Sequence, residues 1–93
     1  MKTIKKISVR NMTSKNSGRE IPNQFIIQTP DGLYFQSYNT MIAAKVNGKR
    51  YLDKTSWDYS VTTGKYRNQF LNEVKKDTER KIVSGEYELV NLN

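Results

Sequence analysis

Two turn sequences, Pro30-Asp31-Gly32 and Asn47-Gly48, each lie between runs of residues that favour β-strands. Proline presets φ for a turn, and glycine accepts the positive φ that many turns need. An Asn-Gly pair between such runs is among the strongest local signals for a hairpin. The sequence therefore predicts two consecutive β-hairpins over residues 24–38 and 41–52, the first with a three-residue loop and a bulge.

Further strands are predicted at both ends of the chain. Residues 3–10 favour a short strand with Ile7 and Val9 on one face, and residues 87–92 alternate as a closing strand does. Between the first strand and the first hairpin, residues 11–22 are polar and predict a flexible loop of about twelve residues. Its Lys15 and Arg19 make it either a phosphate-contacting arm or a mobile surface loop.

The apolar period changes after the second hairpin, and a helix is predicted from about residue 62 to Asn72. Ser60, Thr62 and Thr63 are all suitable helix N-caps, and asparagine tolerates the left-handed conformation that ends a helix. Asp77 is then the cap of a second helix that Ser84-Gly85 ends, with a single helix over about 63–84 as the alternative. The residues expected to pack these helices on the sheet are Tyr66, Phe70, Leu71, Val74 and Ile82.

The chain has 93 residues, enough for one small domain with one core. The expected fold is α+β: an antiparallel sheet of four to six short strands, built from two hairpins, packed by one or two C-terminal helices. No apolar run reaches the roughly 18–20 residues that span a bilayer. The basic start at Met1 is not followed by the apolar stretch of a secretory signal. No membrane association is expected, and the cytoplasm is the expected compartment.

Positive charge is concentrated in the first half of the chain. Residues 1–52 hold nine Lys and Arg against two Asp and Glu, whereas residues 53–93 hold seven of each, so the whole net charge of +7 lies before residue 53. This asymmetry indicates an anionic partner, with solubility alone as the alternative. Lys45, Lys49 and Arg50 gather at the tip of the second hairpin. They either enter a nucleic-acid groove or protect a strand edge from aggregation.

The residues that support catalysis are few. The chain has no His and no Cys, which removes histidine base catalysis, thiol nucleophiles, disulfides and most zinc sites. The five glycines are far apart, so no phosphate-binding loop is present. Asp53 and Asp58 are better explained as turn and cap residues than as metal ligands. We therefore expect no enzymatic activity, no metal and no cofactor.

The segment from Trp57 to Asn68 combines aromatic, hydroxyl and basic residues at the expected helix start. Free N–H groups at a helix N-terminus favour an anion, and hydroxyls with Lys65 and Arg67 add phosphate contacts. Trp57 or Tyr59 is a candidate for base stacking, although a core position is the preferred interpretation for Trp57. Lys65 and Arg67 are expected to be exposed in either case.

Four segments carry a resemblance to known proteins: YFQSYNT (34–40), YLDKTSWDYS (51–60), TTGKYRNQFL (62–71) and KIVSGEYELVNLN (81–93). Together they resemble a group of small, largely uncharacterised bacteriophage proteins, over about residues 23–93. The resemblance implies a phage or prophage origin and no particular activity. Small phage proteins are commonly nucleic-acid binders or inhibitors of host machinery.

The leading hypothesis is a non-catalytic phage accessory protein that binds nucleic acid, DNA ahead of RNA, in the cytoplasm of an infected bacterium. The alternative is an inhibitor that docks on an acidic surface of a host protein, such as a defence complex of the kind that anti-CRISPR proteins target. Strandedness, sequence specificity and oligomeric state stay open. The expected nucleic-acid contacts are Lys5, Lys6, Lys15, Arg19, Lys45, Lys49, Arg50, Trp57, Tyr59, Thr62, Thr63, Lys65 and Arg67.

Overall fold

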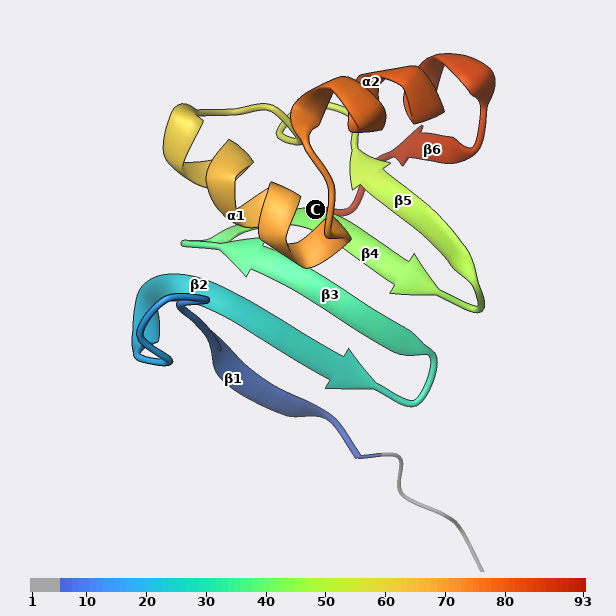
Figure 1. The fold of residues 1–93 in the computed structure, drawn as a ribbon. Helices are drawn as coiled ribbons and strands as arrows, with labels where there is room; N and C mark the ends of the chain where they lie inside the picture. Colours follow the sequence, from blue (N-terminus) through green and yellow to red (C-terminus); the bar gives the residue numbers. More distant parts are fainter. Residues whose placement is uncertain (1–5) are drawn as a thin grey trace, which may run out of the picture.

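The computed structural model describes residues 6–93, which form one six-stranded sheet with two helices on one of its faces (Figure 1). The elements are β1 (Ser8–Thr13), β2 (Glu20–Thr29), β3 (Gly32–Ser37), β4 (Thr40–Val46), β5 (Lys49–Asp53), α1 (Val61–Leu71), α2 (Lys75–Ser84) and β6 (Tyr87–Val90). The strands follow one another in sequence order. The expected α+β class is confirmed. In the described part of the chain no helix is long and apolar enough to cross a membrane.

Neighbouring strands are antiparallel from β1 to β5, and β6 is parallel to β5. The parallel pair follows from the connection, because α1 and α2 carry the chain across the sheet between these two strands. Asp53, the last residue of β5, is opposite Val90 in this pair; it is buried and accepts hydrogen bonds from the backbone of Ser56 and Leu92. The parallel direction of β6 is the one element of sheet topology that departs from the prediction.

Both predicted hairpins are present. Asn47 and Gly48 form the β4–β5 turn with φ of 51° and 78°, the left-handed values that this two-residue turn needs. The β2–β3 loop has two residues, not three, because Thr29 already pairs with Gly32. Gly32 is required there for space: a Cβ on it would lie 1.9 Å from the carbonyl oxygen of Lys45 on the next strand.

The predicted loop over residues 11–22 is wrong at both ends. β1 continues to Thr13 and β2 begins at Glu20, so the connection is a short turn over residues 14–19. Backbone pairing between the strands needs no apolar side chains, and the turn is closed by the Ser14 N–H, which donates to the Arg19 carbonyl. The Asn11 side chain also donates to the Ile21 carbonyl and joins the two strands.

Two helices form, not one. Asn72 ends α1 in the left-handed conformation at φ 56°, as predicted, and Ser60 is the N-cap whose hydroxyl accepts from the Thr63 N–H. Asp77 does not cap α2, because that helix already begins at Lys75, with Val74 as its N-cap. Val74 is 61% exposed and therefore is not part of the core, contrary to the prediction.

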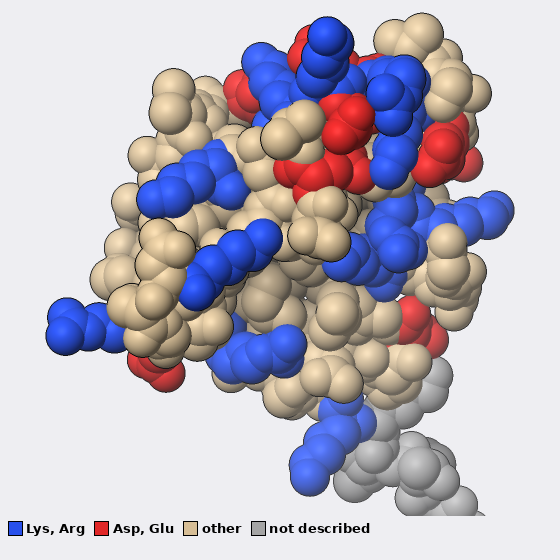
Figure 2. All heavy atoms as spheres, in the orientation of Figure 1, with Lys and Arg blue, Asp and Glu red and all other residues tan. Residues whose placement is uncertain are grey.

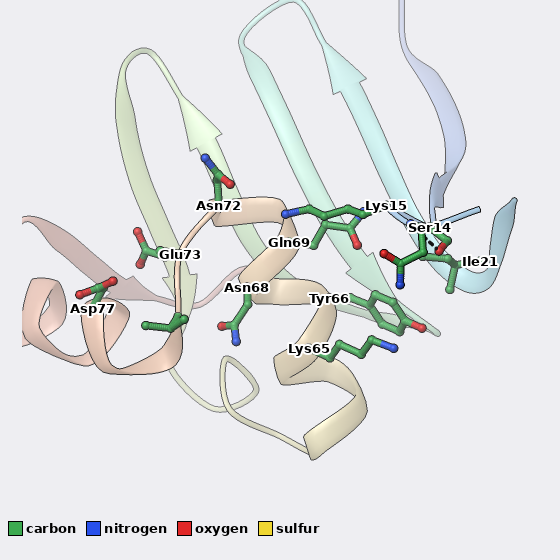
Figure 3. A pocket seen from close by; sticks show the side chains of 12 residues that line it. Ser14, Lys15, Ile21, Lys65, Tyr66, Asn68, Gln69, Asn72, Glu73 and Asp77 are labelled. Atoms are coloured by element: carbon green, nitrogen blue, oxygen red, sulfur yellow. Dashed lines mark hydrogen bonds between the residues drawn. The ribbon is translucent and has the colours of Figure 1, made fainter. Parts of the chain in front are cut away.

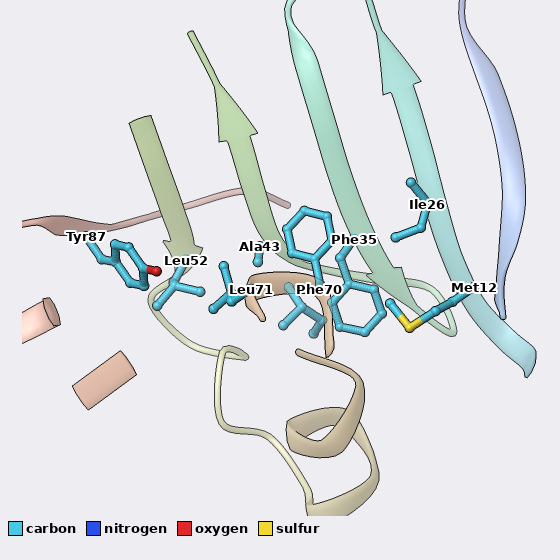
Figure 4. Packing of buried hydrophobic residues seen from close by; sticks show 9 residues of the cluster. Met12, Ile26, Phe35, Ala43, Leu52, Phe70, Leu71 and Tyr87 are labelled. Atoms are coloured by element: carbon cyan, nitrogen blue, oxygen red, sulfur yellow. The ribbon is translucent and has the colours of Figure 1, made fainter. Parts of the chain in front are cut away.

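The core lies between the sheet and α1. Phe70 stacks on Phe35 with 5.8 Å between ring centroids, and Leu71 packs in the same cluster with Ala43 and Leu52 (Figure 4). The predicted packing of Phe70 and Leu71 is confirmed, and Tyr66 and Ile82 pack partly buried at its margin. Figure 1 shows that the helices leave the hairpin ends of the strands uncovered on this face.

Candidate nucleic-acid interface

The ion pairs of the described residues all lie between residues 58 and 86. They join Arg67 and Lys75 to Asp58, Arg80 to Asp77, and Lys81 to Glu73 and Glu86. The basic side chains of β1, β4, β5 and the β1–β2 turn take part in none of these pairs. The positive charge of the first half of the chain is therefore free to face solvent or a ligand.

Several of these side chains line three adjacent hollows on the side of the sheet that carries the helices. The hollow lined by Lys15 and Lys65 shares Gln69 with the hollow lined by Arg10 and Lys45. It shares Asn72, Glu73 and Asp77 with the hollow lined by Lys49 and Arg50. Basic side chains spread across this side of the molecule, whereas most acidic ones gather around α2 (Figure 2). Two cations of these hollows, Arg80 and Lys81, are paired with acids of α2 and its neighbours. We call the six that form no ion pair the basic band: Arg10, Lys15, Lys45, Lys49, Arg50 and Lys65.

One end of the basic band brings together the β1–β2 turn and α1. Lys15 comes from the turn and Lys65 from the helix, and in Figure 3 they lie on either side of Tyr66. The Lys65 ammonium is 5.3 Å from the centre of the Tyr66 ring. The Gln69 side chain donates to the Thr13 carbonyl and holds the turn against the helix. Two lysines that are fifty residues apart in the sequence thus face one hollow.

The other end of the basic band lies on the β4–β5 hairpin. Lys45 and Arg50 are directly opposite each other in the strand register, an arrangement that disfavours folding because the charges repel. Partial burial lowers the pKa of Lys45 and the charge of Arg50 lowers it further, while the charge of Glu73 partly offsets both. The Lys45 ammonium also lies 4.6 Å from the centre of the Phe70 ring. This end therefore holds two cations at close range, neither of which forms an ion pair among the described residues.

Arg67 corrects the sequence prediction. It was expected to be an exposed phosphate contact, but it is 1% exposed and lies beneath Trp57, 5.2 Å from that ring. Its guanidinium donates to the Trp57 carbonyl and to the side chains of Asp58 and Asn68. The backbone between β5 and α1 folds over the helix and covers this position. Arg67 has a structural role, and Trp57 packs half-buried against the core.

The start of α1 is also not the open anion site that was expected. Thr63 is buried, and its hydroxyl is hydrogen-bonded to the hydroxyl of Ser37 at 3.3 Å. Ser60 already caps the helix, while Thr62 is exposed and outside the basic band. Tyr59 is 78% exposed and lines a different hollow together with Tyr38. Tyr59, Thr62 and Thr63 are therefore separated from the basic band, and Tyr66 is the aromatic residue of this segment that lines one of its hollows.

The remaining predicted contacts have different positions. Lys5 lies outside the described residues, while Lys6 and Arg19 are exposed but line none of the three hollows. The sequence analysis missed Arg10, which lines a hollow with Lys45. The alternation of β1 was the available signal, because Ile7 and Val9 occupy one face and leave Arg10 on the other.

Glu73 is the acidic group closest to the middle of the basic band. Its side chain is 6% exposed and accepts hydrogen bonds from Lys81, Tyr87 and Thr78. Burial alone would raise the pKa of Glu73, but these three donors outweigh it, so the pKa lies below its usual value. Burial in turn raises the pKa of Tyr87. The charge of Glu73 is thus compensated by its own three donors.

Within residues 6–93 no group of three acidic side chains is placed to hold a metal ion.

The fold and this site define a small two-layer α+β domain with a cationic, hollowed face. Residues 7–86 match the model of a family of unknown function (DUF8033). Because that match covers most of the chain, the protein belongs to this family. No curated protein and no solved structure matches the chain.

Proposed function

We propose that this protein binds nucleic acid, DNA in preference to RNA, through the basic band and without catalysing a reaction. The observation that carries the proposal is the segregation of charge. Acidic residues pair with four helical cations, which are Arg67, Lys75, Arg80 and Lys81. The cations of the strands and the β1–β2 turn, with Lys65 of α1, form no ion pair in the described part of the chain. A family of unknown function gives no competing assignment.

The juxtaposition of Lys45 and Arg50 supports an anionic ligand in particular. Two cations held opposite each other cost folding energy, and a phosphate between them reverses the sign of that interaction. The neutral polar residues of the hollows, including Asn68, Gln69 and Asn72, supply further donors for phosphate oxygens. These contacts hold a sugar-phosphate backbone and do not read bases, so the proposed binding has little sequence preference.

The biological setting is part of the same proposal. The resemblance to small bacteriophage proteins favours a phage or prophage origin, and we propose the cytoplasm of the infected bacterium as the place of action. A DNA-mimicking inhibitor would carry the opposite charge, so the net charge of +7 supports nucleic acid itself as the ligand.

The test is the dependence of affinity on salt. Fluorescence anisotropy with single- and double-stranded DNA and RNA of mixed sequence is measured at several salt concentrations. If about five phosphates are neutralised on duplex DNA, log K falls with log salt at a slope of roughly −4 to −5. Absence of binding at low salt, or binding that salt does not weaken, contradicts the proposal. In that case, capture of a host protein from nuclease-treated lysate favours the inhibitor hypothesis.

A further inference from the structure

The sheet has a second face, on the side away from the helices, and its side chains are mostly apolar. The strand registers place one row of residues across β1–β5 on this face: Val9, Ile27, Tyr34, Ala44 and Tyr51. A second row beside the first contains Asn11, Phe25, Gln36 and Met41. An antiparallel sheet that faces water on one side normally has polar residues there. This sheet has apolar residues on both faces and helices on only one.

Neighbouring side chains of the first row pack against one another. Ala44 is fully buried although it lies on the face without helices, because it stands between Tyr34 and Tyr51 on the neighbouring strands. At the β1 edge Val9 is 62% exposed. The small alanine between two tyrosines gives the centre of the face a continuous surface of rings. No described element covers it (Figure 1).

We propose that a second copy of the chain covers this face, with the two sheets packed against each other. Charge favours this partner. The continuation of the first row on β6 is Glu88, and the other residues of the two rows carry no formal charge. Two chains of net charge +7 repel each other over most of their surfaces, and this neutral face lets them approach. A nucleic acid would need several cations there for its phosphates. The two rows supply none, and the hairpin end of this face adds only Lys49, which is opposite Val46.

The size of the face also fits a second copy. Five strands about 4.8 Å apart, with about six residues of roughly 3.3 Å rise each, give a footprint of roughly 500 Å². Two copies would therefore bury about 1,000 Å² in total, which is the lower bound for a specific protein interface. Sheets that pack face to face keep their strands within about 30° of each other. The result is a weak, twofold-symmetric dimer with both basic bands on its outer sides.

The test measures the oligomeric state of nuclease-treated full-length protein, so its outcome does not depend on the proposed function. Sedimentation velocity is recorded from about 1 μM to 1 mM, which spans the range of weak dimers. Ile27→Asp places two carboxylates at the centre of the interface, and Val9→Asp places them at its edge, where the side chain is already exposed and folding is least affected. Val83→Asp, at an 88% exposed position on α2, is the matched control. Circular dichroism checks the fold of each variant.

We expect the unmodified protein and Val83→Asp to dimerise with rising concentration, and folded Val9→Asp and Ile27→Asp to need at least tenfold more protein. If Ile27→Asp fails to fold, Val9→Asp gives the result alone. A monomer at every concentration overturns the proposal, as does equal weakening by Val83→Asp. If the protein stays monomeric and Ile27→Asp, but not Val83→Asp, weakens its binding to oligo-dT, the face is a base-stacking platform and the dimer proposal is wrong.

Discussion

The guanidinium of Arg67 lies 5.2 Å from the centre of the Trp57 ring and donates a 2.7 Å hydrogen bond to the Trp57 carbonyl. Arg67 comes from the middle of α1, whereas Trp57 lies in the connection that leads into that helix. The same guanidinium pairs with Asp58 at 3.2 Å. Arg67 therefore attaches the β5–α1 connection to the helix it precedes.

Replacing Arg67 with alanine is expected to lower the free energy of unfolding by about 3 kcal/mol, the lower end of the range for breaking a buried ion pair. We place it at the lower end because Asp58 remains 37% exposed and can be solvated. Arg67→Lys should restore only part of the loss, since an ammonium cannot donate in the same fork. Urea unfolding measures both. Lys65→Ala, on the exposed side of the same helix, is the control and should be close to neutral. A neutral Arg67→Ala would contradict the structural role.

Two glycine substitutions should have opposite effects. Gly32→Ala forces a Cβ against the backbone of Lys45, so the strands must separate and stability falls. Gly64 is in the interior of α1, and the nearest atom to its Cβ would be a guanidinium nitrogen of Arg67 at 3.5 Å, an ordinary van der Waals contact. Gly64→Ala should therefore stabilise the protein by about 0.5–1 kcal/mol through helix propensity. Thermal unfolding of the two variants side by side checks the prediction, and a shift of the same sign for both would contradict it.

Phe70→Ala should cost about 3–5 kcal/mol, as truncation of a buried aromatic residue does. The residue is 7% exposed and stacks on Phe35, so the cavity would open at the centre of the core. For a domain of this size that is a large part of the total stability. Val61→Ala, at a 92% exposed position of the same helix, is the control. Chemical unfolding distinguishes them, and equal effects would show that α1 packs through another side.

Acid should destabilise the protein in part through Glu73. The folded-state pKa of this carboxyl lies below its ordinary value of 4.5, so its stabilising contribution is complete above that value and is lost as the pH falls through the folded-state pKa. Glu73→Gln should lower stability at neutral pH and flatten the loss of stability between about pH 5 and pH 3. Urea unfolding at stepped pH measures this. Glu79→Gln, at an exposed position without an ion pair in the described residues, should leave the profile unchanged.

Much of the fold follows from local sequence. Asn47-Gly48 specifies its hairpin because few residues accept two consecutive positive φ angles, and Asn72 ends α1 for the same reason. The polar strand ends over 11–13 and 20–22 could not be predicted in this way. Met12 and Ile21 reach the core there, but two isolated apolar residues form no alternating pattern. The pairing also uses backbone hydrogen bonds and the side chain of Asn11. The parallel direction of β6 depends on where two helices carry the chain, which is a property of the tertiary structure.

The candidate site was less predictable than the fold. Charge asymmetry located the cations in the first half of the chain, and Lys15, Lys45, Lys49, Arg50 and Lys65 do line connected hollows. Arg67 was expected to be exposed because arginine is rarely buried, although a position three residues before Phe70 lies on the same side of a helix. Arg67 is buried because the β5–α1 connection passes over the helix and covers its side chain.

The basic band itself is tested by charge reversal at the β4–β5 hairpin. Lys49→Glu with Arg50→Glu changes the net charge by −4 beside a turn whose shape depends on Asn47 and Gly48. DNA affinity at low salt should fall at least tenfold, and the salt slope should decrease by about 1–2 because one or two phosphate contacts are lost. The thermal midpoint should hold or rise, since removing Arg50 relieves its repulsion of Lys45.

Lys54→Glu with Lys76→Glu is the matched control for this double variant. It changes the net charge by the same −4, at two exposed positions that line none of the hollows of the basic band. If binding depends on the basic band, the control keeps most of its affinity and its salt slope. If both double variants lose affinity equally, the protein attracts DNA through net charge alone, and the arrangement of Lys45, Lys49 and Arg50 at the hairpin has no part in binding.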